Sequence, residues 1–555
     1  MRAGEGRGSM DKAAGSIEGN VVQVLDKRIF RGRVSWAGGV ITEVEELGDE
    51  EPGYPYLIPG FIDAHVHIES AMLPPAEFGR QAVRHGMVAA VADPHEIANV
   101  LGADGVRFMV ASARRTPFKT FFGVPSCVPA TPFETAGAAL DLAEMESLFQ
   151  EPEVRHLAEM MNFPGVLAGD AQVMAKIELA RRLGRPVDGH APGLRSSEAA
   201  RYAAAGISTD HECFTLAEAH DKLACGMHIL VREGSAACNF AALHSLITTH
   251  TEQVMLCCDD KHPDDLAAGY LDRLAARAVA LGHHPLAVLR CACVNPVLHY
   301  GLPVGLLRPG DAMDAALVAD LRDFLVLKVW LAGNLAALIG FTLLPKIAVA
   351  PVNNFRARPI TAADLQLPAG QGPLPVIEAI DGELITRRLL LEPRRAGGVP
   401  VADPEQDILL LCVVNRYQEA PPALALIRGF GLKNGALASS VAHDSHNVVA
   451  VGTDADSLCR AVNAVIEAKG GIAVADASCV DLLPLPIAGL MSDGDGQQVG
   501  RRYAELDQLA HGLGSNLRAP FMTLSFMALL VIPELKLSDR GLFDGRSFCF
   551  VDARQ

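Results

Sequence analysis

Short apolar runs alternate with longer amphipathic stretches between about residues 58 and 295. Most apolar runs are bounded by glycine or polar residues, as expected of buried strands, and stretches such as 76–85, 170–183 and 196–205 have the character of helices. Repeated strand–helix units predict a parallel sheet, and eight of them predict an α/β TIM barrel. The eight predicted strands are 60–65, 87–92, 120–124, 154–158, 186–189, 207–210, 227–231 and 254–258.

The pattern changes on both sides of this region. Residues 17–58 and about 300–370 contain short strand-like segments separated by glycine turns. Because these segments flank the barrel, we expect them to pair into a small composite β-sandwich domain, with the barrel at 59–299. Residues from about 375 to 555 mix strand-like and helical segments, which predicts an additional C-terminal α+β domain.

Composition limits the class of protein. The chain has 555 residues, of which half are hydrophobic and a fifth charged, an ordinary profile for a globular protein of several domains. Its net charge of −17 argues against a nucleic-acid partner, because phosphates require a basic surface. The twelve cysteines are scattered and several lie in apolar runs, which favours free buried thiols in a reducing cytoplasm.

Neither the N-terminal segment nor the longest apolar stretch predicts a membrane protein. Residues 1–16 are rich in Gly, Arg and Ser and lack the apolar core of a signal peptide, so we expect a disordered leader. The longest apolar stretch, 317–352, is interrupted by charged residues and by Pro345. We therefore expect a cytoplasmic protein with no membrane partner.

Polar residues follow almost every predicted barrel strand. His65 and His67 end the first strand and, because side chains alternate along a strand, they point the same way. Catalytic groups of TIM barrels occupy these carboxyl ends. The polar residues after the later strands are Asp93, His95 and Glu96; Glu159; His190; Asp210, His211 and Glu212; Glu233; and Asp259 and Asp260.

Each of these residues alone has an ordinary structural explanation. His190 could bond to a loop carbonyl, Asp259 could cap a helix, and Glu96 could pair with an arginine. So many histidines and acids at matching positions are costly to bury, however, unless they bind a metal or one another. Imidazole and carboxylate ligands without thiolate suit Zn, Mn or Fe, and this set is large enough for two ions about 3.5–4 Å apart that share a hydroxide. We therefore predict a binuclear metal centre and a hydrolytic reaction.

Longer motifs resemble those of the bacterial adenine deaminases, within the amidohydrolase superfamily. The first is Pro-Gly-Phe-Ile-Asp-Ala-His-Val-His-Ile-Glu-Ser at 59–70, and another is Ala-His-Asp-Ser-His-Asn at 442–447. The resemblance extends from about residue 20 to the end of the chain. The other matching motifs lie at 93–102, 125–132, 159–165, 188–193, 210–212, 485–493 and 531–536.

The resemblance implies hydrolytic deamination of adenine to hypoxanthine and ammonia in purine salvage. It implies two divalent metal ions, for which we expect Mn²⁺, with Fe²⁺ or Zn²⁺ as alternatives, and we expect a homodimer or higher homo-oligomer. The implied metal ligands are His65, His67, His190, His211 and Asp259. We expect Glu96 to be the bridging carboxylate and Glu159 to lie near the substrate, and the reverse assignment stays open.

Further residues are assigned roles as hypotheses. Glu159 would donate a proton to the N1 atom of adenine, which requires a raised pKa, and Asp259 would carry a proton to the departing amine. Ser126, Glu212 and Glu233 are candidate substrate contacts. The segment His443-Asp444-Ser445-His446 would be a loop that closes over the site or a second metal cluster, and its structural alternative is a polar loop at a domain interface.

Other reactions are weighed against deamination of adenine. Deamination of a related 6-aminopurine and hydrolysis of a cyclic amide are the alternatives. Cyclic-amide hydrolases usually carry a carbamylated lysine after the fourth strand, where this chain has Glu159 and no lysine before Lys176. A cytidine-type zinc deaminase would need a Pro-Cys-x-x-Cys motif, which the sequence lacks. A catalytically dead barrel would not need a candidate ligand after so many strands.

Overall fold

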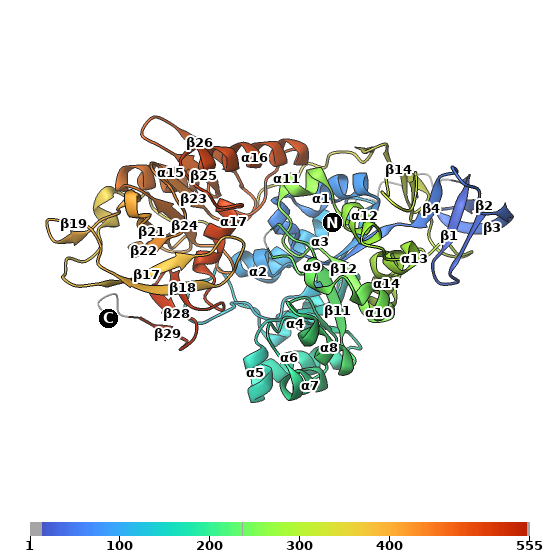
Figure 1. The fold of residues 1–555 in the computed structure, drawn as a ribbon, viewed down its shortest axis with the longest axis horizontal. Helices are drawn as coiled ribbons and strands as arrows, with labels where there is room; N and C mark the ends of the chain where they lie inside the picture. The colour runs from blue at the N-terminus through green and yellow to red at the C-terminus, as the bar shows by residue number, and fades with distance from the viewer. Residues whose placement is uncertain (1–13, 236, 552–555) are drawn as a thin grey trace, which may run out of the picture.

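The computed structural model describes residues 14–235 and 237–551. The barrel lies in the middle of the molecule, between a β-sheet that contains the N-terminal strands and a large C-terminal region (Figure 1). Of the expected leader, residues 1–13 lie outside the described residues. The leader was expected to extend to Ser16, but Gly15 and Ser16 already pair with Trp36 and Ser35 in the first sheet, so its boundary was placed too late.

All eight predicted barrel strands are present, and they form an α/β TIM barrel. Five parallel strands run in the order β5-β6-β7-β8-β9 and three in the order β10-β11-β12. Parallel bridges from Val66 to Asp259 and from Val187 to Ile207 join the two sets at both edges. The strands are β5 (Phe61–Val66), β6 (Met87–Ala92), β7 (Lys119–Val124), β8 (Val154–Met160), β9 (Val187–Gly189), β10 (Thr209–Asp210), β11 (His228–Arg232) and β12 (Val254–Cys257).

Helices follow the barrel strands, and side-chain caps fix where several of them begin. The carboxylate of Asp170 accepts from the first backbone N–H groups of α6, and the Thr215 hydroxyl does the same for α8. The helices of this region are α1 (Pro75–Ala82), α2 (His95–Leu101), α3 (Ala103–Ala113), α4 (Leu142–Leu148), α5 (Phe163–Ala168), α6 (Ala171–Arg182), α7 (Ser196–Ala204), α8 (Leu216–Ala224), α9 (Phe240–Leu243), α10 (Leu246–Thr249), α11 (Pro263–Ala268), α12 (Leu271–Ala280), α13 (Pro285–Leu289) and α14 (Asn295–Tyr300).

Strands from both flanks of the barrel join in one eight-stranded sheet, in the order β16-β15-β14-β13-β4-β1-β2-β3. β4 pairs in parallel with β1 and antiparallel with β13, so it links the two flanks. Trp36 and Trp330 meet edge to face with ring centroids 6.1 Å apart, which shows that the sheet folds over a shared core. The strands are β1 (Gly15–Gln23), β2 (Arg28–Ala37), β3 (Val40–Asp49), β4 (Tyr56–Pro59), β13 (Ala315–Val318), β14 (Val326–Leu331), β15 (Asn334–Leu338) and β16 (Phe341–Thr342).

The C-terminal region contains a second eight-stranded sheet, in the order β18-β17-β22-β21-β24-β23-β25-β26. The apolar side chains Leu458, Val462 and Val465 of α15 pack against one face of it, and Asp454 caps that helix. The elements are β17 (Leu374–Ala379), β18 (Thr386–Leu391), β21 (Leu409–Val414), β22 (Ala423–Arg428), β23 (Ala436–Ser439), β24 (Val448–Gly452), α15 (Ala455–Glu467), β25 (Gly471–Ala475), β26 (Val480–Pro484), α16 (Gly496–Gly512), α17 (Pro520–Ser525), β27 (Leu535–Ser538), β28 (Gly541–Asp544) and β29 (Cys549–Phe550).

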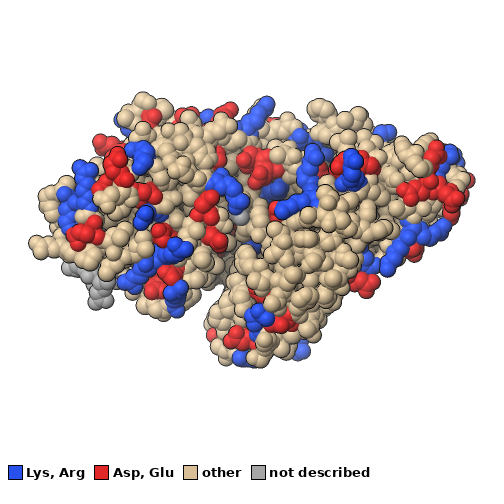
Figure 2. Space-filling view, in the orientation of Figure 1, with Lys and Arg blue, Asp and Glu red and all other residues tan. Residues whose placement is uncertain are grey.

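The C-terminal region contacts the barrel beside its mouth. Asn447 donates to the carbonyl of Thr135 at 2.9 Å, and the Thr135 hydroxyl donates to Asp539 at 2.7 Å. On the face in Figure 2, acidic and basic side chains are interspersed. All twelve cysteines are free. Within the described ranges, none of the helices has the length and apolar character needed to cross a membrane.

Candidate metal centre

The hydrogen bonds that close the barrel also bring the first candidate ligands together. The backbone N–H of Asp259 donates to the carbonyl of His65 at 2.9 Å, and the N–H of His67 donates to the carbonyl of Asp259 at 3.1 Å. The last barrel strand therefore ends beside the first. This ladder fixes three side chains at one edge of the barrel mouth.

His65, His67 and Asp259 form a compact set of donor atoms. The two Nε2 atoms lie 3.2 Å apart, and each lies 3.2 Å from Oδ1 of Asp259. Donor atoms around a tetrahedral ion with bonds of about 2.1 Å lie about 3.4 Å from one another. The triangle thus has the size that a divalent metal ion requires, and all three side chains are buried.

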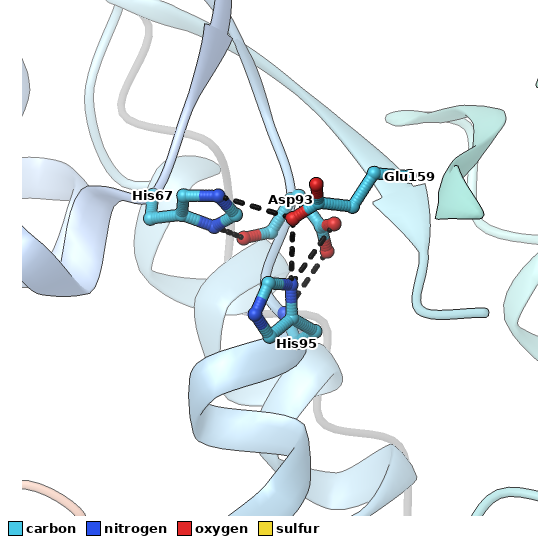
Figure 3. A group of neighbouring side chains, drawn as sticks. All are labelled: His67, Asp93, His95 and Glu159. Atoms are coloured by element: carbon cyan, nitrogen blue, oxygen red, sulfur yellow. Dashed lines mark hydrogen bonds and ion pairs between the residues drawn. The ribbon is translucent and has the colours of Figure 1, made fainter. Parts of the chain in front are cut away.

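Glu159 lies between this triangle and a second pair of histidines. Its Oε1 is 3.3 Å from Nε2 of His67, while its Oε2 is 2.7 Å from Nδ1 of His190 and 3.1 Å from Nε2 of His211. Figure 3 shows the carboxylate of Glu159 reaching from β8 toward His67 and His95. One carboxylate therefore contacts both groups, which is the arrangement needed to bridge two ions.

Glu96, the expected bridge, points to other partners. Its two oxygens contact Nδ1 of His443 and Nε2 of His446, both from the C-terminal region. Nδ1 of the neighbouring His95 faces both acids, 3.0 Å from Oδ2 of Asp93 and 3.5 Å from Oε1 of Glu159 (Figure 3). Sequence reasoning placed Asp93 and His95 at this strand end but assigned neither of them a role.

The side chains around Glu159 lower its pKa, whereas the expected role as a proton donor requires a raised pKa. Burial alone would raise its pKa, but His190 and His211 outweigh burial and hold the pKa well below the usual range. The raised pKa predicted for Glu159 is therefore wrong, because the histidines that surround it favour the charged carboxylate. These contacts favour the ionised carboxylate, which suits Glu159 as a candidate metal ligand better than as a proton donor.

Arg232 is the functional neighbour that the sequence did not reveal. This buried last residue of β11 contacts Oδ2 of Asp259 and Oε1 of Glu212, each at 2.5 Å from Nη1. Burial alone would raise the pKa of Asp259, but Arg232 and the adjacent histidines hold it well below its usual range. The signal available beforehand was the position of Arg232 beside Glu233 at a barrel strand end.

A cavity of about 560 Å³ opens onto these ligands. Its floor includes His67, Glu159, His190, His211 and Asp259, and its walls are contributed by both the barrel and the C-terminal region. The apolar wall residues are Met161, Phe163, Pro192, Phe214, Leu384, Ile385, Phe526, Leu529, Val531, Ile532 and Pro533. An apolar chamber with a few polar groups at one end is the usual form of a small-molecule site.

The three candidate substrate contacts fall in different places. Glu212 lines the cavity. The Ser126 hydroxyl instead donates to the backbone carbonyl of Glu159 at 2.5 Å, and Glu233 pairs with Arg277; neither residue is part of the cavity wall. His443 and Asp444 do line the cavity, so the C-terminal histidine segment lies at the site.

Comparisons with known proteins agree with this geometry. The amidohydrolase family matches residues 56–336, and the adenine deaminase C-terminal domain matches residues 383–549. A protein from Salinibacter ruber named adenine deaminase is 53% identical over 542 residues, which cover 97% of this chain and 99% of the relative. The chain belongs to the adenine deaminase family. Relatives of the same name from Sulfurovum sp. and Methanosarcina acetivorans are 49% and 48% identical, over 97% and 96% of this chain and 99% and 98% of their own lengths.

Membership of the family explains why the C-terminal region forms part of the cavity. The C-terminal match includes the wall residues Leu384, Ile385 and Phe526 as well as His443 and Asp444. The barrel match includes all the candidate ligands His65, His67, Glu159, His190, His211 and Asp259. The site is thus built from both of the regions that the family models recognise.

Proposed function

We propose that this chain hydrolyses adenine to hypoxanthine and ammonia, within purine salvage. The observation that carries the proposal is the near-full-length relationship to adenine deaminases, which includes the C-terminal part of the cavity. The converging imidazole and carboxylate donors beneath an apolar chamber suit hydrolysis of a planar heteroaromatic ring, whose faces can pack against the chamber walls.

His65, His67 and Asp259 would hold one divalent ion, and His190 and His211 the other. Glu159 is the better candidate for the bridge than Glu96, because its two oxygens contact both groups. Mn²⁺ is the expected metal, with Fe²⁺ or Zn²⁺ as alternatives, since all of these donors are nitrogen or oxygen. Bound there, the ions would lower the pKa of a water molecule and so supply the nucleophile.

The protein's own groups would bind the ring and move the protons. Phe163, Phe214 and Ile385 would enclose the purine and exclude water from it. Asp259, which Arg232 keeps ionised, would accept a proton from the nucleophile and hand it to the departing amine. Glu212 would contact the polar edge of the base, since it lies on the cavity wall.

The division into domains, the cellular location and the oligomeric state are also part of the proposal. The domains would be a composite domain of residues 17–58 with about 300–370, joined by the paired residues Gly15 and Ser16, a barrel at 59–299 and a C-terminal domain from about 375. We also propose a cytoplasmic homodimer or higher homo-oligomer, with adenine as the small-molecule partner.

Ammonia release tests the proposed activity. Purified protein reconstituted with Mn²⁺ would be assayed with adenine, other 6-aminopurines, adenosine and cyclic amides. We expect adenine to give the highest kcat/KM. A preference for a cyclic amide, or no release of ammonia from any aminopurine, would overturn the proposal.

The bridging assignment needs a separate test, in which Glu159→Gln and Glu96→Gln are compared by metal analysis. We expect Glu159→Gln to lose one of the two ions of the barrel centre, because a neutral amide is a poor bridge. If Glu96→Gln loses an ion from that centre while Glu159→Gln keeps both, the bridge is Glu96.

A further inference from the structure

A second group of metal-binding side chains lies beside the barrel centre, where the C-terminal region meets the barrel. It consists of His95, Glu96, His443 and Asp444, with His446 behind Glu96. All five side chains are between 1% and 6% exposed. The adenine deaminase reaction as proposed above uses none of them.

The donor atoms of this group converge. Nε2 of His95 lies 3.5 Å from Oε1 of Glu96 and 3.7 Å from Oδ1 of Asp444, and the three donor atoms all lie within 4.8 Å of one another. Nδ1 of His443 contacts the same oxygen of Glu96. Two imidazoles therefore face one oxygen of Glu96, and the carboxylate of Asp444 lies beside His95.

The surrounding contacts orient these donors as metal ligands are oriented. Nδ1 of His95 faces Asp93 at 3.0 Å and Glu159 at 3.5 Å, and its Nε2 faces Glu96 and Asp444. Nδ1 of His446 accepts from the N–H of Ala442 at 3.2 Å, so its Nε2 carries the proton and donates to Oε2 of Glu96. His446 thus occupies Oε2 of Glu96, while Oε1 faces His95 and His443. A cation bound among these atoms would replace the hydrogen bond between Nδ1 of His443 and Oε1.

The carboxylates of Glu96 and Asp444 face imidazoles, not lysine or arginine side chains, in the ion pairs of the described residues. Oδ2 of Asp444 is buried without a hydrogen-bond partner. The buried acid Glu134 lies close enough that burial, with the charge of Asp444, raises its pKa to about 8. A carboxylate oxygen buried without a partner is expensive, and a bound cation would remove that cost.

We propose that His95, Glu96, His443 and Asp444 bind a third divalent transition-metal ion, separate from the two of the barrel centre. Nitrogen and oxygen donors without sulfur suit Zn²⁺, Mn²⁺ or Fe²⁺. The ion links the start of α2 to the segment 442–447 of the C-terminal region. Because His443 and Asp444 line the cavity, the ion holds one cavity wall in place.

Metal stoichiometry tests the third site without any measurement of activity. Full-length protein, stripped with a chelator and reloaded with Zn²⁺, would be desalted and analysed for metal, and crystals of it would be examined by anomalous diffraction at the zinc edge. Zn²⁺ is the probe because it binds such ligands more tightly than Mn²⁺. We expect about three ions per chain, one of them between His95, Glu96 and Asp444.

Asp444→Asn should reduce the count from about three to about two, with the loss at the third position. Asp539→Asn is the matched control, because Asp539 also lies at the contact between the two regions but bonds only to Thr135 and Asn415. It should keep three ions. Far-ultraviolet circular dichroism would show that both variants are folded.

Two results would overturn the third site. One is wild-type protein that holds two ions, with no anomalous peak between His95 and Asp444, in which case these residues form only a hydrogen-bonded contact. The other is an Asp444→Asn protein that still holds three. Neither result depends on ammonia release, so failure of the third site and failure of the proposed deamination are distinguishable.

Discussion

Two buried groups of charged side chains meet at the end of β10, and their charges are balanced in different ways. Asp210, the last residue of β10, is fully buried with Lys222, whose Nζ lies 2.9 Å from Oδ2 of Asp210, 2.9 Å from Oε1 of Glu218 and 2.7 Å from the carbonyl of Ala191. The next residue, His211, points to Glu159 and belongs to the metal centre.

The difference separates a structural cluster from a functional one. Lys222 has three donors and each finds an acceptor, so the Asp210 cluster is complete without any ligand. In the metal centre, His65 and His67 instead turn their Nε2 atoms toward each other and toward Asp259, which leaves acceptor atoms facing one another. Two imidazole nitrogens and a carboxylate oxygen that converge in this way form a set of ligands suited to a divalent cation.

The largest effect that the comparison predicts is a loss of turnover in Asp259→Asn. An amide cannot take and return a proton, and a group with that role typically contributes about 10²–10⁴-fold. We expect kcat for ammonia release from adenine to fall by about that factor, while the midpoint of thermal unfolding changes little.

Metal analysis of Asp259→Asn separates the role of Asp259 as a metal ligand from its role as the proton carrier. Asp221→Asn is the control, since Asp221 pairs with Arg195 away from the cavity and its loss should leave kcat unchanged. Near-normal turnover by metal-loaded Asp259→Asn would exclude Asp259 as the proton carrier.

Much of the barrel could be predicted because its signal is local. Each buried strand is a short apolar run, and the structure has β6 at Met87–Ala92, as the sequence predicted. The positions of His65, His67, His190 and His211 follow from the same reasoning, because residues just past parallel strands share one edge. The long C-terminal motifs predicted the family for the same reason, since they are contiguous in sequence.

Contacts between distant segments could not be predicted in this way. Nothing in the spacing of Glu96 shows that its partners are His443 and His446, about 350 positions later in the chain. The choice between Glu96 and Glu159 as the bridge depends on which direction each side chain takes from its strand end. That direction is set by packing between β6, β8 and the C-terminal region, which a linear pattern does not contain.

Lys222→Met should cause a large loss of stability instead of a loss of chemistry. The substitution leaves the carboxylates of Asp210 and Glu218 buried without their counter-ion, which typically costs about 3–5 kcal/mol. Denaturation by urea, followed by circular dichroism, would measure the loss. Lys433→Met is the control, because Lys433 is exposed and bonds only to a loop carbonyl. Unchanged stability of Lys222→Met would contradict the structural role of this cluster.

Removal of Lys222 should reverse the pH dependence that Asp210 contributes to the free energy of unfolding. In the wild type, burial would raise the pKa of Asp210, but Lys222 outweighs burial and lowers it, so its stabilisation is present above about pH 4 and is lost as the pH falls through the folded-state pKa. Without Lys222, burial dominates and raises the pKa, so the charged carboxylate destabilises the fold at neutral pH. The stability gap between wild type and Lys222→Met should therefore narrow from pH 7 to pH 5, by about 1.4 kcal/mol for each unit of pKa difference titrated. A gap that is constant over this range would show that Asp210 is not the group left unpaired.

The metal centre opens onto a cavity, whereas the Asp210 cluster is closed by its own hydrogen bonds. The smallest predicted effect concerns that cavity. Ile385 lines the cavity from the C-terminal region, directly before β18, and is 47% exposed. Ile385→Ala should remove about 1 kcal/mol of apolar contact with the substrate and raise KM for adenine roughly five-fold, with kcat nearly unchanged. Leu390→Ala is the matched control, because Leu390 lies on the same strand but away from the cavity and is 57% exposed. Equal KM values for the two variants would mean that the barrel side alone binds the base, and that the C-terminal wall serves only to close the chamber.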